Sequence, residues 1–146
     1  MSQKTNKFYH IKLIKEGRPE YCTEITSPQD AVSFFQKRIG ASPQEHFVAL
    51  FLNTRNGLLG WREISRGTLN ANLVHPRETF APAVQLMAAA IIVAHNHPAG
   101  NPEPSREDIA VTKQLRDAGK LLGIPLLDHL IVTENNFLSL KEQGAL

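Results

Sequence analysis

The segment at residues 88–108, AAAIIVAHNHPAGNPEPSRED, constrains the fold of this chain more than any other. An unbroken apolar run at 88–94 ends abruptly in the four residues His-Asn-His-Pro at 95–98. A loop rich in proline and glycine follows, and residues 105–108 (Ser-Arg-Glu-Asp) have the composition of a helix start. We therefore expect a buried strand, a stiff loop and a helix in this order, with polar side chains gathered where the strand ends.

The main body around this segment alternates between strand and helix patterns. Residues 47–52 (FVALFL) are apolar at every position, which is typical of a strand covered on both faces of its sheet. Asn56-Gly57 is a strong hairpin signal, so residues 58–65 are predicted to return as the next strand. Further strands are predicted at 90–97 and 126–133, and helices at 76–88, 105–122 and 138–143. The order predicts an α/β layered domain.

Two of these helices carry more detailed expectations. Pro82 lies inside the helix predicted to start at 75–78, and we expect it to kink that helix or delay its start. The helix at 105–122 is the longest, and Gly123 and Pro125 are expected to end it. Its buried stripe is predicted to contain Ile109, Thr112, Leu115, Ala118 and Leu122.

The first part of the chain reads as an extension of this body. Residues 8–14 (FYHIKLI) are predicted to form a strand, 16–19 a turn, and 21–25 its antiparallel partner. Ser27 to Asp30 has the form of a capping box with proline at the first helical position, and Gly40 would end that helix. We accordingly divide the chain into an N-terminal hairpin and helix extension at 1–43 and a main domain at 44–146.

Composition narrows the functional classes. The 146 residues suit one body with a core of ordinary size, and a net charge of +2 neither demands nor excludes an anionic partner. Cys22 is the sole cysteine, which excludes an intramolecular disulfide and a thiolate metal cluster. No secretory signal core or membrane-spanning apolar window occurs, so we expect a cytoplasmic protein with no membrane partner. The oligomeric state is not legible in the sequence.

His95, His97 and Asp108 are the candidate metal ligands. Two histidines two positions apart on a strand project from the same face, and the first turn of the next helix can bring Asp108 back toward them. Two imidazoles and a carboxylate leave the fourth position of tetrahedral zinc open for water, as a catalytic site requires. Other divalent metals also accept this ligand set.

Each ligand also has an ordinary structural explanation. Ser105 and Asp108 are spaced as a capping box, and an isolated His-x-His is more often incidental than ligating. The conjunction of strand end, stiff loop and helix start favours a metal site. Capping and metal binding also need not compete, because the first helical turn fixes where the carboxylate points.

The remaining polar candidates are less specific. Asp128 and His129 are expected on opposite faces of the last strand. One of them could orient a zinc-bound imidazole, and a satisfied pair in the core or on the surface explains them equally well. His75 is assigned to a helix start without chemistry, and His10 and His46 to the surface.

These residues resemble a known family. His-x-His-Pro at 95–98, followed at the right spacing by Ser105 and Asp108, is similar to the JAMM motif of MPN-domain metalloproteases. Together with GTLNANLVHPRE before it and LLDHLIV after it, the stretch looks like bacterial RadC-type proteins. The resemblance implies a cytidine-deaminase-like α/β/α sandwich with a mixed β-sheet. Ala99 and Asn96 stand where many members carry serine, and neither position is a ligand.

The resemblance also implies a reaction and its residues. It implies Zn²⁺ held by His95, His97 and Asp108, and a hydrolase that cleaves a peptide or isopeptide bond in a peptide or protein substrate. Ser105 would stabilise the oxyanion of the transition state. A glutamate at the start of an early strand would act as general base on water, which is Glu45 here, with Glu63 as the alternative. The ordinary explanation of Glu45 is an exposed charge at a strand edge.

Two other functional classes stay open at this point. RadC-type chains usually carry an N-terminal helix-hairpin-helix region, and this sequence is expected to be a short form without it. That expectation weakens the implied DNA association and the role of a DNA-repair accessory, which a steep salt dependence of DNA binding would support. A non-catalytic MPN scaffold is the third hypothesis, and the intact ligand set argues against it.

Overall fold

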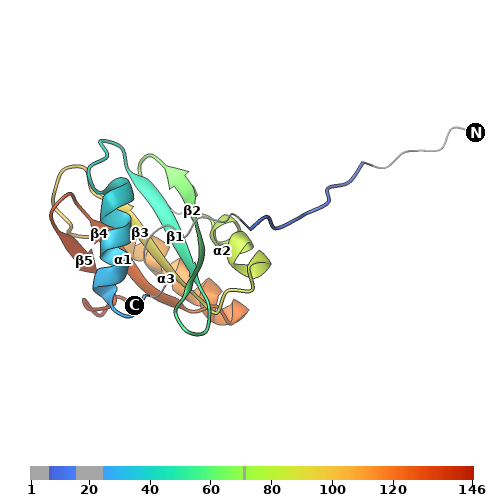
Figure 1. The fold of residues 1–146 in the computed structure, drawn as a ribbon. Coiled ribbons are helices and arrows are strands. Elements are labelled where there is room, and N and C mark those ends of the chain that lie inside the picture. Colours follow the sequence, from blue (N-terminus) through green and yellow to red (C-terminus); the bar gives the residue numbers. More distant parts are fainter. Residues whose placement is uncertain (1–6, 16–24, 71) are drawn as a thin grey trace, which may run out of the picture.

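The computed structural model describes residues 7–15, 25–70 and 72–146. Figure 1 shows a sheet flanked by helices, and the order of elements follows the chain. The helices are α1 (Pro28–Phe35), continued by the π-helical turn η1 (Gln36–Gly40), α2 (Pro76–Gln85) and α3 (Arg106–Leu122). The strands are β1 (His46–Leu52), β2 (Leu58–Arg66), β3 (Ala90–Asn96), β4 (Leu126–Val132) and β5 (Phe137–Ser139).

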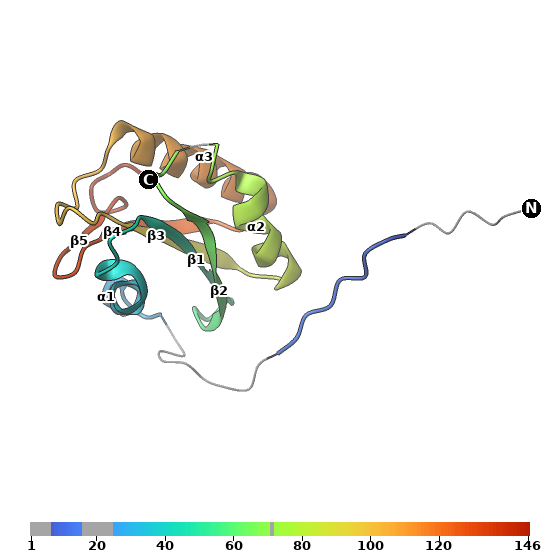
Figure 2. The ribbon, with the colours of Figure 1, turned by 90° about the horizontal axis from the view of Figure 1, so that it is seen from above.

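The elements form three layers. Viewed from above, α1 lies on one side of the sheet and α2 with α3 on the other (Figure 2). Strand β1 shows why: its residues 47, 49 and 51 belong to the hydrophobic core under α2 and α3, whereas 48, 50 and 52 belong to the core under α1. The strand predicted to be covered on both faces is therefore confirmed, and so is the α/β/α sandwich.

The sheet is mixed, and its topology brings two distant chain segments together. The five strands lie in the order β2-β1-β3-β4-β5. Strand β3 runs antiparallel to β1 and parallel to β4, and α3 makes the crossover between β3 and β4. Because Phe47 pairs with His95, the beginning of β1 lies beside the end of β3. That edge of the sheet carries the candidate site.

Most predicted helix boundaries are confirmed. The Asp30 carboxylate accepts hydrogen bonds from the backbone N–H groups of Thr26 and Ser27, which caps α1. Gly123 ends α3 in the left-handed conformation, with φ 71°. Helix α2 starts at the predicted position and includes Pro82, so its start is not delayed. Within the described residues, no helix is long and apolar enough to span a membrane.

The predicted strand at residues 8–14 is wrong. Residues 7–15 form no regular secondary structure, and Phe8 and Tyr9 are 86% and 98% exposed. A strand is stable only with a ladder partner and a face to bury, and an apolar alternation by itself supplies neither. The expected turn and most of the return strand, at 16–24, lie outside the described residues. The division at residue 43 stays a prediction, although α1 shares its core with the sheet.

The predicted terminal helix at 138–143 is also wrong. The Asn135-Asn136 turn is confirmed, but the chain returns from it as β5, which pairs antiparallel with β4. The buried Asp128 carboxylate stabilises β5 and the residues that follow it. It accepts hydrogen bonds from the Ser139 hydroxyl at 2.6 Å and from the Lys141 N–H at 3.1 Å. Tertiary contacts with β4 therefore override the local helical spacing.

The predicted buried stripe of α3 is confirmed except at Leu122, and its residues Ile109 and Ala118 are partly buried and pack against hydrophobic clusters. Thr112 and Leu115 are buried as expected, but Leu122 is 49% exposed. The other buried residues of α3 are Asp108, Val111 and Gly119. Of these, Asp108 belongs to the candidate site, and Gly119 lies against the chain that enters β4.

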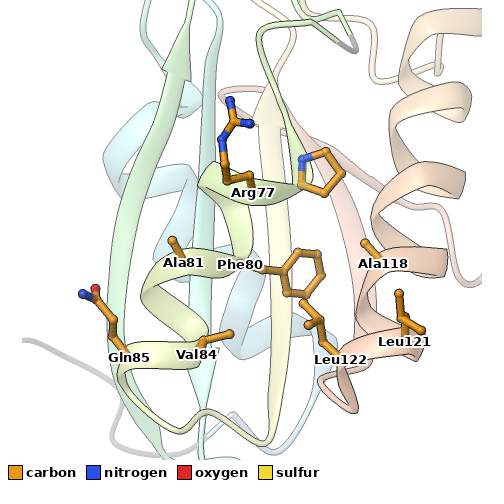
Figure 3. Close-up of a pocket in the computed structure, with 9 residues that line it drawn as sticks. Arg77, Phe80, Ala81, Val84, Gln85, Ala118, Leu121 and Leu122 are labelled. Atoms are coloured by element: carbon orange, nitrogen blue, oxygen red, sulfur yellow. The ribbon is translucent and has the colours of Figure 1, made fainter.

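An apolar groove of about 490 Å³ separates the outer surfaces of α2 and α3 (Figure 3). Phe80 forms its floor, and Val84, Leu121 and Leu122 line its walls. Arg77 contributes its charged side chain. The groove does not include the three candidate metal ligands, so it is separate from the site described below.

Gly119 tests the packing of α3. A Cβ added there would lie 2.5 Å from the Ile124 carbonyl oxygen and 3.2 Å from the Phe80 ring. We expect Gly119→Ala to lower the free energy of unfolding by about 1–3 kcal/mol despite the better helix propensity of alanine. Thermal and urea unfolding would measure this loss.

Gly60→Ala is the matched control, because its added Cβ would meet only the Leu86 side chain, at 3.4 Å. Equal stability of Gly119→Ala and the wild type would show that the helix is not packed as closely as described.

Candidate metal centre

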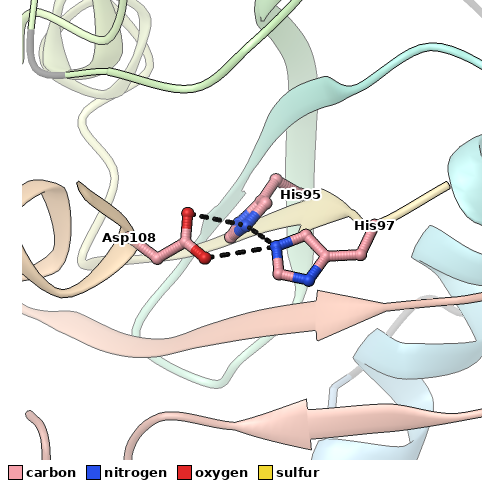
Figure 4. Close-up of side chains that lie close together, drawn as sticks. All are labelled: His95, His97 and Asp108. Carbon is pink, nitrogen blue, oxygen red and sulfur yellow. Dashed lines mark hydrogen bonds and ion pairs between the residues drawn. The ribbon is translucent and has the colours of Figure 1, made fainter. Parts of the chain in front are cut away.

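Three side chains converge at the edge of the sheet where β3 ends (Figure 4). The Nε2 atoms of His95 and His97 are 2.9 Å apart. Each Nε2 also lies 3.1 Å from an oxygen of Asp108, His95 from Oδ1 and His97 from Oδ2. His95 and Asp108 are buried, whereas His97 is partly exposed. The three ligands predicted from the sequence are therefore brought together.

Strand β3 and helix α3 fix this arrangement. His95 lies within β3, and the His97 N–H continues the pairing with β4 by donating to the Val132 carbonyl oxygen at 3.0 Å. At the helix, the Ser105 N–H donates to Asp108 Oδ2 at 2.8 Å and the Asp108 N–H donates to Ser105 Oγ at 3.1 Å. The predicted capping box thus exists, and it aims the Asp108 carboxylate at the imidazoles.

The loop after β3 orients His97. Nδ1 of His97 lies 2.8 Å from the Asn101 carbonyl oxygen, which can only accept a hydrogen bond. His97 therefore carries a proton on Nδ1, and in the neutral ring the Nε2 lone pair faces the cluster. The residues between 97 and 101 are Pro98, Ala99 and Gly100, and Gly100 has a φ of 90° that favours glycine.

The cluster is strongly coupled electrostatically. Burial acts to raise the pKa of the Asp108 carboxyl, but hydrogen bonds with His95, His97 and the Ser105 N–H hold its pKa well below the usual range. The hydrogen bond with Asp108 raises the pKa of His97, burial opposes this, and the Asn101 carbonyl and the charge of Glu45 add to the rise. The centre therefore presents an ionised carboxylate beside two imidazoles.

The donor atoms fit a divalent metal. In tetrahedral zinc sites with metal–ligand bonds of about 2.0–2.1 Å, neighbouring ligand atoms are roughly 3.3 Å apart. The donor atoms here are 2.9–3.1 Å apart, so a small outward shift accommodates an ion. Imidazole nitrogen with carboxylate oxygen also suits zinc and its first-row neighbours.

Glu45 lies next to this centre, at the residue before β1. Its Oε2 accepts a hydrogen bond from the Leu69 N–H at 3.1 Å, and Leu69 belongs to the core under α2 and α3. Its charge acts on the pKa of His97. The glutamate that the sequence suggested as base is therefore on the same side of the sheet as the candidate ligands.

Glu63, the alternative base, lies on the other side of the sheet. It pairs in register with Val48, whose side chain belongs to the core under α1. Its carboxylate is engaged by His46 Nδ1 and by the Arg66 guanidinium, and the Arg66 hydrogen bond is the main cause of its lowered pKa. His46, expected on the surface, is partly buried, with its side chain 14% exposed.

Asn96 is a site residue that the sequence analysis missed. It is fully buried between the two histidines in sequence and points to the opposite face of the sheet. Its Nδ2 donates to the Gln44 carbonyl oxygen at 2.8 Å, and its Oδ1 accepts from the His46 N–H at 2.7 Å. Asn96 therefore forms hydrogen bonds with the backbone on both sides of Glu45 and fixes that residue beside the end of β3.

His129 and Thr112 line the inner side of the centre, and both are fully buried. His129 Nε2 lies 2.7 Å from His95 Nδ1, and Thr112 Oγ1 lies 2.6 Å from His129 Nδ1. Burial lowers the pKa of His129 well below its usual value. Asp128 belongs to the β5 return, so of the two residues left open by the sequence only His129 contacts a candidate ligand. Thr112 was predicted merely as a core residue.

The chain is similar in sequence to proteins of one family. The sequence model of the RadC-like JAB domain family matches residues 25–145. A UPF0758 protein from Shouchella clausii is 52% identical over 120 residues, which are 82% of this chain and 52% of the relative. A UPF0758 protein from a Geobacillus species is 51% identical over 82% of this chain and 53% of the relative. One from Bacillus velezensis is 46% identical over 92% and 58%. The chain thus spans about half the length of these relatives.

Metal analysis tests the centre. We expect the wild type to take up about one equivalent of a divalent metal, and His95→Ala and His97→Ala to take up far less, because each removes one of three ligands. Elemental analysis after purification without added metal, followed by Zn²⁺ titration, would measure both. His10→Ala is the control, since His10 is exposed in the segment at 7–15. A His95→Ala variant with full metal content would exclude this site.

Asn96 provides a second prediction. Asn96→Ala leaves the His46 N–H and the Gln44 carbonyl without their partner, so we expect a loss of about 1–3 kcal/mol in unfolding free energy. Asn135→Ala, at an exposed turn position, is the control. Chemical denaturation of the two variants would measure the difference. Equal unfolding free energies of Asn96→Ala and Asn135→Ala would contradict a stabilising role of the Asn96 hydrogen bonds to residues 44 and 46.

Proposed function

Because the chain belongs to the RadC-like JAB domain family, we propose that it is a JAMM-type metallohydrolase that cleaves a peptide or isopeptide bond. We further propose that its metal is Zn²⁺, held by His95, His97 and Asp108. The observation that carries the proposal is the convergence of these three ligands with Glu45 on one side of the sheet. Metal site and base are the two components that such a reaction requires.

A Zn²⁺ ion held by His95, His97 and Asp108 would supply Lewis-acid chemistry, which typically lowers the pKa of water to about 7 and polarises a carbonyl group. The residues of the chain would carry out the proton transfers. Glu45 is the proposed general base. One of its carboxylate oxygens accepts a hydrogen bond from the Leu69 N–H, and the carboxylate can still accept a proton. It would take a proton from the attacking water and deliver it to the leaving nitrogen.

Ser105 would support the transition state. Its hydroxyl accepts from the Asp108 N–H, and this bond uses a lone pair and not the hydroxyl hydrogen. Ser105 is exposed, so its O–H can turn toward the oxygen that gains negative charge as the amide carbonyl is attacked. The helix start therefore provides one metal ligand and one hydrogen-bond donor.

Glu45→Gln tests the proposed base. Glutamine keeps the size of the side chain and an oxygen acceptor for the Leu69 N–H but cannot take up a proton, so we expect unchanged Zn²⁺ binding and a loss of turnover of 10²-fold or more. A library of peptides and isopeptide-linked peptides, incubated with Zn²⁺-loaded protein and read by mass spectrometry, would measure the turnover.

Glu63→Gln is the matched control, because Glu63 lies on the opposite face. It is expected to retain turnover. Full activity of Glu45→Gln would remove Glu45 from the mechanism. A wild type that binds Zn²⁺ but cleaves no member of the library would favour the non-catalytic scaffold.

A further inference from the structure

We propose that His129 and Thr112 form a hydrogen-bond relay that holds His95 with the Nε2 lone pair directed at the metal. This inference rests on the metal site of the proposed function, and it assigns the two residues as positioning residues, since neither reaches the ligand side of His95. Both lie behind the cluster, on β4 and α3, and both are completely buried.

The contacts form one continuous path. Starting at the ligand, His95 Nδ1 meets His129 Nε2 at 2.7 Å, and His129 Nδ1 meets Thr112 Oγ1 at 2.6 Å. The Thr112 hydroxyl donates in turn to the backbone carbonyl oxygen of Asp108 at 2.7 Å. The path therefore begins at one metal ligand and ends on the backbone of another.

The positions of the protons follow from the end of the path. The Asp108 carbonyl oxygen can only accept, so the Thr112 hydrogen goes there and the hydroxyl oxygen must accept from His129. His129 then carries its proton on Nδ1, and its Nε2 accepts from His95 Nδ1. A neutral His95 with its proton on Nδ1 has a lone pair on Nε2, which is the atom beside His97 and Asp108.

The reversed path would work against metal binding. If the Thr112 hydroxyl donated to His129 instead, His129 would donate to His95 Nδ1, and the His95 proton would lie on Nε2. That proton would point at Asp108 Oδ1, at the place where the ion must bind. Of the two polarities, only the one that uses the Asp108 carbonyl as final acceptor is compatible with an occupied centre.

Packing keeps the relay in place. The Phe47 ring stacks on the His95 ring with centroids 6.4 Å apart, and its edge meets the His129 ring at 5.6 Å. Each residue lies on a regular element: Phe47 on β1, His95 on β3, His129 on β4 and Thr112 on α3. A group that forms a hydrogen bond with the other nitrogen of a metal-binding histidine fixes the tautomer of that histidine. Removing such a group typically lowers metal affinity by about 10–100-fold.

The tautomers test the relay directly. In protein labelled with ¹⁵N-histidine and loaded with Zn²⁺, long-range ¹H–¹⁵N correlation spectra should show both His95 and His129 protonated on Nδ1. His129 protonated on Nε2 would overturn the proposal, because its Nε2 could not then accept from His95.

Affinity provides the second test. We expect His129→Leu and Thr112→Val to weaken Zn²⁺ binding by about 10–100-fold, measured by competition with a chromophoric chelator. His129→Gln, which restores an oxygen acceptor near the Nε2 position, should recover part of the loss. Thr79→Val is the matched control, because Thr79 is also a buried helical threonine that donates to the carbonyl four residues back, at His75. It should bind Zn²⁺ like the wild type.

The outcomes separate this inference from the proposed function. Wild-type affinity in Thr112→Val and His129→Leu would overturn the relay and leave the hydrolase proposal intact. Weakened binding in both, with Thr79→Val unchanged, would support the relay even if the wild type cleaves no peptide. A wild type that binds no Zn²⁺ would overturn both.

Discussion

The antiparallel pairing of β1 with β3 is the constraint on which the candidate centre depends. It places the start of β1 beside the end of β3, so that Glu45, the residue before β1, lies on the same side of the sheet as His95 although the two are far apart in sequence. Asn96 reinforces the pairing from the other face through the backbone of residues 44 and 46. Two neighbouring residues of β3 thus point to opposite faces: His95 is a candidate metal ligand, and Asn96 supports the backbone around Glu45.

The start of α3 is the second constraint, because the carboxylate that caps the helix also belongs to the candidate metal site. The Asp108 carboxylate accepts from the Ser105 N–H as a cap and also faces both imidazoles as a candidate metal ligand. An isolated buried carboxylate would be strongly unfavourable, and these partners offset that cost. Among the described residues, no buried side-chain nitrogen or oxygen lacks a hydrogen-bond partner. The centre is thus a satisfied polar network, which is the condition for a rigid metal site.

The sequence predicted the parts of the site that follow local patterns. His95 and His97 share a strand face by periodicity, and Asp108 follows from the capping spacing. Asn96 and Thr112 were missed because their roles depend on which residues of other elements lie opposite them, and no local pattern contains that information. At 8–14 and 138–143 the apolar spacing was compatible with the predicted element. At 138–143 the pairing with β4 decided the outcome, because the chain forms β5 there and not a helix.

The choice between Glu45 and Glu63 shows how strand register determines which residues can act together. Glu45 precedes β1 and Glu63 lies within β2, and no local sequence pattern distinguishes them as candidate bases. Phe47 pairs with His95 and faces the α3 side, whereas Val48 pairs with both Ala94 and Glu63 and faces α1. A slip of one residue between β1 and β3 would reverse these faces and bury the candidate ligand His95 under α1. The Asn96 side chain bonds to the backbone of Gln44 and His46, so it favours the register in which Glu45, and not Glu63, lies on the face of the candidate metal ligands.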